Sequence, residues 1–257
     1  METILVDRDG RGVVTVTLNR PAKKNAATAR MWDELFETFS EVSANDADRV
    51  LVLTGAGGAF CSGADLSATD ELTRSGMTRL RLIGRAALAL HTLAKPTIAK
   101  VEGIAAGAGW NMALVCDLVV ASDTARFSQI FARRGLSLDF GGSWLLPRLV
   151  GMQKAKELAF FADMLSAADA EALGLVNRVV PAGELDAFVD EWAGRLAAGP
   201  PIALASTKTL LNNSFAVSMA QAVEDEARAQ NVNFATDDFK EAVRAFLDKR
   251  EPRFEGK

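Results

Sequence analysis

The chain of 257 residues has few of the side chains that carry common enzyme chemistry. It contains one histidine, His91, and two cysteines, Cys61 and Cys116. A zinc site would need mostly carboxylate ligands, and two cysteines give no disulfide framework, so we expect neither. His91 stands near the end of an expected helix, before Pro96, where a histidine usually has a structural role. We therefore predict no metal and no catalytic histidine.

Basic residues and long apolar runs are also scarce. Lysine and arginine number 29 against 33 acids, which gives a net charge of −4 and an isoelectric point near 5.2. This balance disfavours nucleic-acid and anionic membrane partners. The longest uncharged apolar run, 103–116, is too short to span a bilayer, and the acidic start METILVDRDGRG is unlike a signal peptide. We expect a soluble, cytoplasmic protein.

Strand and helix patterns alternate along most of the chain. Helical patterns occupy 25–42 and Leu72–Leu93. This alternation predicts an α/β fold. Pro200 and Pro201 then interrupt the chain, and only helical patterns follow. We divide the sequence into a core, 1–198, and a helical region, 199–257. The expected strands are 13–21, 49–57, 97–103, 117–122 and 125–129.

Two segments share one pattern, in which a strand is followed by small residues and then a helix: LVLTGAGGAFCSGADL (51–66) and AKVEGIAAGAGWNMAL (99–114). Neither is a nucleotide motif, because Ala64 and Asp65 replace the P-loop Lys and Ser/Thr, and Met112 replaces a third glycine. Small residues allow close approach to backbone amides that are unpaired at a helix N-terminus. Two interpretations stay open: an oxyanion hole, or tight turns with close helix–strand packing.

Six motifs together resemble the crotonase family, also called the enoyl-CoA hydratase/isomerase superfamily: LNRPAKKNA, GAFCSGADL, GIAAGAGWNMALVCDLVVAS, GGSWLLPRLVG, LSAADAEALGLVNRVV and AFLDKREPRF. The resemblance covers nearly the whole chain and is closest to 1,2-epoxyphenylacetyl-CoA isomerase-like members. It implies a crotonase-type spiral of ββα units whose C-terminal helices form a homotrimer or a hexamer. It also implies an acyl-CoA substrate, its thioester oxygen between the amides of Ala64 and Ala108, and no separate cofactor.

The reaction depends on which acids are present. Hydratases of the family carry two glutamates, and here Asn111 and Phe131 stand at those positions. Neither side chain can activate water or deliver a proton. Asp139, in the apolar stretch RRGLSLDFGGSW, stands where some relatives place an acid that faces the acyl group. We predict an enoyl-CoA isomerase in which Asp139 carries the proton, with Ala64, Ala108 and Asn111 completing the catalytic group.

The resemblance also assigns substrate contacts. Coenzyme A is expected along the N-terminal basic stretch and the first glycine-rich loop, and Trp110 and Phe131 beside the acyl group. Two further contacts would come from the tail of a neighbouring subunit. The predicted contacts are Lys23, Ala26, Ala64, Asp65, Leu66, Trp110, Phe131, Phe246 and Lys249.

Other interpretations of Asp139 stay open. It precedes an expected helix and is a favoured N-cap residue. Pairing with Arg133 or Arg134 would lower its pKa and weaken it as a base. The alternative functions are an enoyl-CoA hydratase as the family default, a thioester hydrolase or dehalogenase with Asp139 as nucleophile, and a non-catalytic binding protein. The dehalogenase alternative is weakened because Gly84 stands where that enzyme has a histidine.

Overall fold

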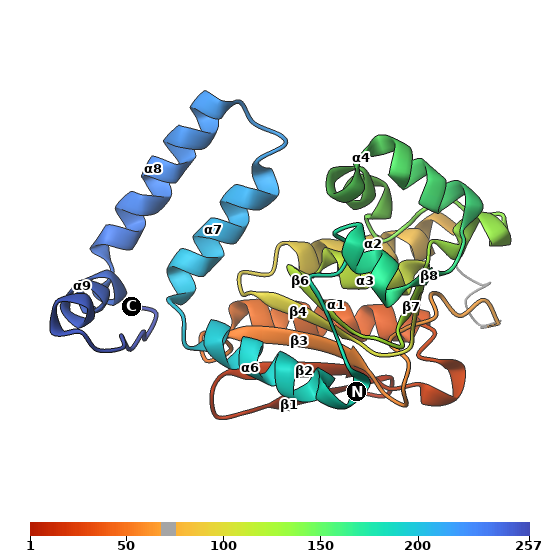
Figure 1. The fold of residues 1–257 in the computed structure, drawn as a ribbon, viewed down its shortest axis with the longest axis horizontal. Coiled ribbons are helices and arrows are strands. Elements are labelled where there is room, and N and C mark those ends of the chain that lie inside the picture. Colours follow the sequence, from red (N-terminus) through yellow and green to blue (C-terminus); the bar gives the residue numbers. More distant parts are fainter. Residues whose placement is uncertain (68–75) are drawn as a thin grey trace.

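The computed structural model describes residues 1–67 and 76–257, and a six-stranded sheet forms its centre (Figure 1). β1 and β2 are antiparallel, and every other neighbouring pair in this sheet is parallel. In spatial order its strands are β1 (Ile4–Arg8), β2 (Val13–Leu18), β3 (Val50–Gly55), β4 (Thr97–Val101), β6 (Leu118–Ser122) and β9 (Arg178–Val180). A smaller sheet contains β5 (Ile104–Ala106), β7 (Arg126–Ser128) and β8 (Leu165–Ser166).

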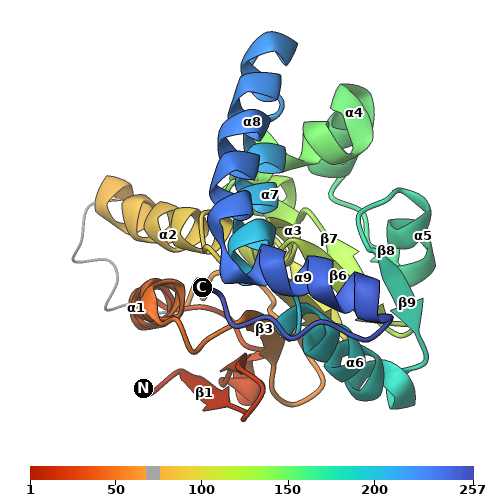
Figure 2. The ribbon, with the colours of Figure 1, turned by 90° about the vertical axis from the view of Figure 1, so that its left-hand side faces the viewer.

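Both faces of the large sheet are covered. Successive side chains of a strand point to opposite faces. On β3, Val50 and Val52 pack in a core with α6 (Leu185–Ala197), whereas Leu51 and Leu53 pack in the main core on the other side (Figure 2). The main core is formed with α1 (Ala29–Ala44), α2 (Gly76–His91) and α3 (Ala108–Val115). Burial on both faces explains why β3 is continuously apolar in the sequence.

The first long helix follows directly from its sequence. Thr28 caps α1, because its hydroxyl oxygen accepts a hydrogen bond from the amide of Met31 at 3.3 Å. A stripe at helical spacing then turns toward the sheet and is fully buried, which confirms the predicted face: Met31, Leu35, Phe39 and Val42.

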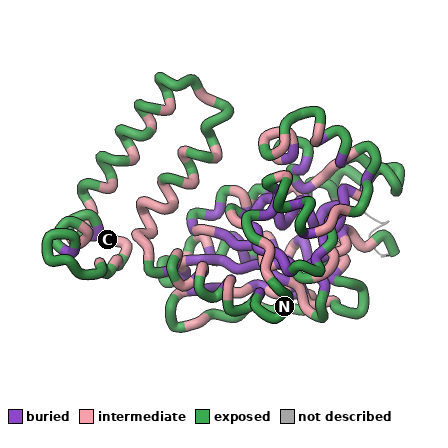
Figure 3. Tube along the Cα trace, viewed as in Figure 1, coloured by how far each residue is buried: buried purple, intermediate pink, exposed green. Residues whose placement is uncertain are grey.

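Three helices at the end of the chain extend away from the sheets (Figure 1): α7 (Pro201–Asn213), α8 (Met219–Ala235) and α9 (Asp237–Asp248). α6 ends at Ala197 and α7 begins at Pro201, so the predicted break lies where the prolines stand. Neither α7 nor α8 buries a residue, and Figure 3 shows the contrast with the buried sheets. The division at residue 198 into two domains stays a prediction.

The predicted α/β fold with a helical C-terminal region is confirmed. The five expected strands correspond to β2, β3, β4, β6 and β7. α2 accounts for most of the expected helix at Leu72–Leu93, and Leu72–Ser75 lie outside the described residues. The α-helices of the described residues also include α4 (Gly142–Phe161) and α5 (Ala167–Ala172). Within the described ranges, no helix combines the length and the apolar character that crossing a membrane requires.

Candidate active site

The two glycine-rich segments meet in space. The amide of Cys61 donates to the oxygen of Ile104 at 3.0 Å, and the amide of Ala106 donates back to Cys61 at 2.9 Å. A Cβ atom on Gly63 would lie 3.1 Å from the oxygen of Ala106 and 3.9 Å from the amide nitrogen of Ala108. The loop after β3 and the start of α3 are therefore in direct contact, as either interpretation of the glycine pattern requires.

Two backbone amides are left without partners at this junction. Ala108 is the first residue of α3, and its amide, like that of Ala64, donates to no acceptor in the described part of the chain. Gly107 holds a positive φ of 54°, which an L side chain rarely adopts. Gly109 lies against Cys61, so a Cβ there would be only 2.3 Å from the Cys61 oxygen. The glycines thus let α3 approach the loop with both amides free.

Ala64 and Ala108 both line a cavity of about 210 Å³. Its other walls are mostly apolar, and Asp139 is its one carboxylate among the described lining residues. Phe131 is buried and lines it, and Leu66 lines it while remaining exposed. The complete lining is Ser62, Gly63, Ala64, Leu66, Ala106, Gly107, Ala108, Ile130, Phe131, Arg134, Leu136 and Asp139.

The carboxyl group of Asp139 has no stabilising partner. Its Oδ1 atom is buried and makes no hydrogen bond to any described residue. Burial raises the pKa of Asp139 from an ordinary 3.8 to about 6. Arg133 instead pairs with Asp163 at 2.6 Å, and no ion pair joins Arg134 to Asp139 within the described structure. The carboxylate is therefore an unusually strong base for an aspartate.

The side chain of Asp139 does not cap the following helix. The N-cap position of α4 is Gly141, with a φ of 80°, and no side chain caps it. The main-chain oxygen of Asp139 accepts the amide of Gly142 at 2.9 Å. Asp139 thus contributes its backbone to the helix start and leaves its carboxyl group free at the cavity.

Asn111 contacts the main chain of Asp139 and does not line the cavity. Its Nδ2 donates to the main-chain oxygen of Asp139 at 2.8 Å, and its Oδ1 accepts from Nε2 of Gln129 at 2.8 Å. Asn111 and Gln129 are both buried. Sequence analysis did not single out Gln129, which follows β7 without any recognisable motif. Both polar groups of the Asn111 amide are engaged by the protein itself.

Trp110 also lies away from the cavity. It is fully buried and packs against Phe127, with a ring-centroid distance of 5.4 Å. It does not belong to the cavity lining. The indole thus packs in the core of the chain, and a contact between Trp110 and an acyl group stays a prediction.

Three of the residues predicted to hold coenzyme A lie in or beside the loop 61–66. Asp65 pairs with Arg20 at 2.9 Å, and the same guanidinium donates to the oxygen of Ala26. The hydroxyl of Ser67 and the guanidinium lower the pKa of Asp65. Lys23 ends the exposed 3-10 turn η1 (Pro21–Lys23). Arg20 lies in the motif LNRPAKKNA but was not predicted as a site residue, and it joins the segments of Ala26 and Asp65.

The other two predicted contacts are far from this cavity within one chain. Phe246 lies on α9 and is 82% exposed, and Lys249 follows the helix in a left-handed conformation. α9 lies at the outer end of the C-terminal helices, on the far side of the molecule from the start of α3 (Figure 1). Any role for Phe246 and Lys249 at a substrate therefore requires another copy of the chain.

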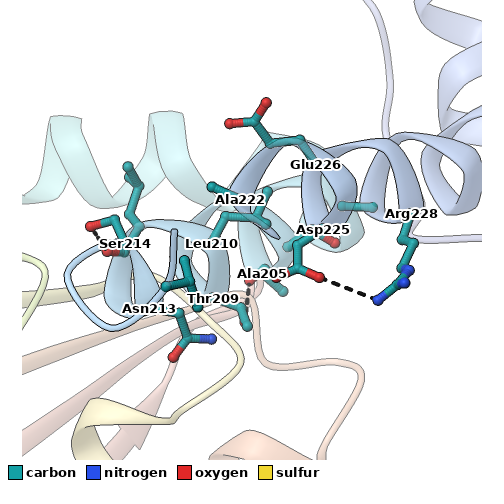
Figure 4. A pocket seen from close by; sticks show the side chains of 13 residues that line it. Ala205, Thr209, Leu210, Asn213, Ser214, Ala222, Asp225, Glu226 and Arg228 are labelled. Atoms are coloured by element: carbon teal, nitrogen blue, oxygen red, sulfur yellow. Dashed lines mark hydrogen bonds and ion pairs between the residues drawn. The ribbon is translucent and has the colours of Figure 1, made fainter. Parts of the chain in front are cut away.

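A larger hollow, about 580 Å³, lies between α7 and α8 (Figure 4). On its α8 side, Asp225 pairs with Arg228 of the same helix at 3.4 Å. None of the site residues predicted from the sequence lines this hollow. We therefore place the candidate active site at the smaller cavity beside Asp139.

Comparison with known proteins agrees with this architecture. The family model described as enoyl-CoA hydratase/isomerase matches residues 8–257. The chain is 37% identical to the 1,2-epoxyphenylacetyl-CoA isomerase of Escherichia coli, over 96% of both proteins. It is 34% identical to the short-chain-enoyl-CoA hydratase of Clostridium acetobutylicum, over 97% of this chain and 96% of that protein. The crystal structure of an enoyl-CoA hydratase from Bacillus anthracis superposes with a TM-score of 0.94 at 31% identity, covering 100% of both chains. The chain belongs to the enoyl-CoA hydratase/isomerase family, the crotonase superfamily.

Proposed function

We propose that the protein is an acyl-CoA isomerase that converts 3-enoyl-CoA esters to 2-enoyl-CoA esters. One observation carries this proposal: Asp139, whose Oδ1 is buried without a hydrogen-bond partner, lines a small apolar cavity together with Ala64 and Ala108, whose amides are free. A base beside an oxyanion hole is the set of groups that a proton transfer next to a thioester carbonyl requires.

The proposed reaction moves one proton and no other atom. The thioester oxygen accepts hydrogen bonds from the amides of Ala64 and Ala108. Asp139 removes a proton from the α-carbon, and the electron pair of that C–H bond forms a double bond to the carbonyl carbon. The π pair of the C=O bond moves onto the thioester oxygen, which gives a dienolate. The two amides stabilise this charge where it develops. Asp139 then returns the proton to the γ-carbon, the carbonyl re-forms, and the double bond stands between the α- and β-carbons.

A hydratase is the main alternative, since relatives with that name are about as similar as the isomerase. Hydration needs one group to activate water and another to protonate the α-carbon. Asn111, at one of the two glutamate positions, has its amide engaged by Asp139 and Gln129, and Phe131, at the other, is apolar. This arrangement favours the isomerase over the hydratase.

We further propose that coenzyme A lies along Lys23, Ala26 and the segment 64–66, at the entrance of the cavity. Phe246 and Lys249 would complete its site from a neighbouring subunit in a trimer or hexamer. Coenzyme A would enter and leave as part of the substrate, so the reaction as drawn uses no further cofactor.

A panel of 3-enoyl-, 2-enoyl- and aryl-CoA esters tests this function. Isomerisation leaves the mass of a 3-enoyl ester unchanged and creates the ultraviolet absorption of a conjugated thioester. Hydration of a 2-enoyl ester adds the mass of water. Release of free coenzyme A would indicate a hydrolase. Conversion of a 3-enoyl ester at constant mass is the expected result, and water addition as the faster reaction would reject the isomerase proposal.

A further inference from the structure

We propose that Gln129 and Asn111 are positioning residues that aim the carboxylate of Asp139 into the cavity, and that Gly142 is required to let them do so. This inference rests on the proposed function. Gln129 donates to Asn111, and Asn111 donates to the main-chain oxygen of Asp139, at 2.8 Å in each case. The chain of two hydrogen bonds runs from the end of β7 to the residue that carries the base.

The direction of these hydrogen bonds is fixed by chemistry. The main-chain oxygen of Asp139 can only accept, so Asn111 must present its Nδ2 there. The Oδ1 of Asn111 then faces the opposite way and needs a donor. Gln129 supplies one from Nε2, while its own Oε1 stays buried without a partner in the described structure. An acceptor at position 129 would favour the wrong rotation of the Asn111 amide.

The position of the carboxylate depends on the hydrogen bond from Asn111 to the Asp139 oxygen, because the backbone beside Asp139 is under strain. Phe140 has a φ of 47°, in the left-handed region that a residue with a Cβ rarely occupies, and Gly141 follows at 80°. Phe140 is buried against Trp32, with ring centroids 5.4 Å apart. A strained turn relaxes when the contacts that hold it are removed. Relaxation at Phe140 would rotate the neighbouring Asp139.

Gly142 provides the space that the Asn111 side chain occupies. A Cβ atom at this position would lie 2.2 Å from Nδ2 and 2.6 Å from Cγ of Asn111. Both distances are far below van der Waals contact, and Asn111 is enclosed by the core. A methyl group at residue 142 would therefore push the Asn111 amide away from Asp139 without removing any polar group.

Neither Gln129 nor Asn111 belongs to the cavity lining, so both act through Asp139. Gln129 occupies the N-cap position of the 3-10 helix η3 (Ile130–Arg134), but its side chain makes no cap hydrogen bond there. The side-chain amide of Gln129 thus donates to Asn111 rather than bonding to the local backbone. Loss of these two hydrogen bonds should impair proton transfer more than substrate binding.

The test compares Gln129→Met, Gln129→Glu and Gly142→Ala with the control Ser128→Ala. Ser128 is the buried neighbour of Gln129, and its hydroxyl donates to the oxygen of Ala162 at 2.9 Å, away from Asp139. We expect each of the three variants to lower kcat about 10- to 100-fold, the loss typical of a displaced catalytic group, with KM nearly unchanged. Ser128→Ala should lower Tm while keeping kcat.

The pH profile of the reaction separates positioning from general destabilisation. In the three variants the carboxylate turns toward water, so the apparent pKa of the base should fall from about 6 toward the ordinary value. Ser128→Ala should leave that pKa unchanged. If one variant fails to fold, the other two still decide the question. Wild-type kcat and pH profile in the folded variants would overturn the inference alone, whereas an inactive wild type would overturn the proposed function and the inference with it.

Discussion

The guanidinium group of Arg20 joins two segments of the candidate coenzyme A site. It pairs with Asp65 at 2.9 Å and also donates to the main-chain oxygen of Ala26. The Asp65 side chain is only 8% exposed, and its carboxylate also accepts hydrogen bonds from the hydroxyl and the amide of Ser67. The ion pair therefore holds the loop that carries the Ala64 amide against the segment after β2.

We expect Arg20→Gln to lower the free energy of unfolding by roughly 2–4 kcal/mol, because it leaves a buried carboxylate without its counter-ion. KM for CoA esters should rise as the loop loosens. Asp65→Asn added to Arg20→Gln should restore part of the stability, since no unpaired charge then remains. Denaturant unfolding of the two single variants and the double variant measures this coupling, and simple additivity of the losses would show that the pair is not coupled.

The raised pKa of Asp139 predicts a stabilising substitution at the candidate active site. The folded state holds the Asp139 proton more tightly than the unfolded chain. This contribution to stability is fully present below the ordinary pKa of 3.8 and is lost as pH rises through about 6. Asn at this position does not ionise, so Asp139→Asn should be more stable than the wild type at pH 7.5 by up to about 3 kcal/mol.

Thermal unfolding across pH checks this expectation. The Tm advantage of Asp139→Asn should be largest above pH 6 and should vanish near pH 4. A variant that is equally or less stable at pH 7.5 would contradict the view that the buried carboxylate is unpaired.

Lys249 allows a test of the proposed contribution from a neighbouring subunit. Lys249→Glu should raise KM for CoA esters more than it lowers kcat, because a binding contact shared by ground state and transition state is lost. Lys156→Glu makes the same charge change on an exposed site of α4, away from the cavity lining, and serves as the control. If the two variants have the same KM, Lys249 is not part of the site.

The C-terminal helices predict self-association. Phe246 and Leu247 on α9 are 82% and 72% exposed, and Phe215 after α7 is 71% exposed. Neighbouring exposed apolar side chains such as the pair on α9 usually mark an interface. Light scattering at micromolar concentration should give three or six times the chain mass of 27.4 kDa. A monomer would contradict both the interface and the proposed role of Phe246 at a neighbour's substrate.

The regular parts of the fold were predictable because their residues carry their own periodicity. The buried stripe of α1 and the apolar run of β3 are examples. β5 lies inside the run of small residues that follows β4, and β8 contains only two residues and depends on its pairing with β7. These strands form through contacts between residues that are distant in the sequence, so a local pattern does not predict them.

The candidate site was predictable where the backbone supplies the function. Gly63, Gly107 and Gly109 mark the two loops in the sequence, and the structure brings those loops together. The side-chain network was not predictable in the same way. Asn111 and the Asp139 oxygen that it binds are 28 residues apart in the sequence. Whether the Trp110 ring points to the cavity or to the core depends on its packing against Phe127, which the sequence pattern does not encode.

Turnover of a 3-enoyl-CoA ester by Asp139→Asn tests the account most directly. The amide has nearly the same volume as the carboxyl group, and the amides of Ala64 and Ala108 remain, so the fold and KM should be kept. Only proton transfer is lost, which should reduce kcat by about 10²- to 10⁴-fold. The wild-type kcat/KM should rise with pH through about 6, the pKa of the buried base. Isomerisation by the folded Asn variant at close to the wild-type rate would contradict the assignment of Asp139 as the proton carrier.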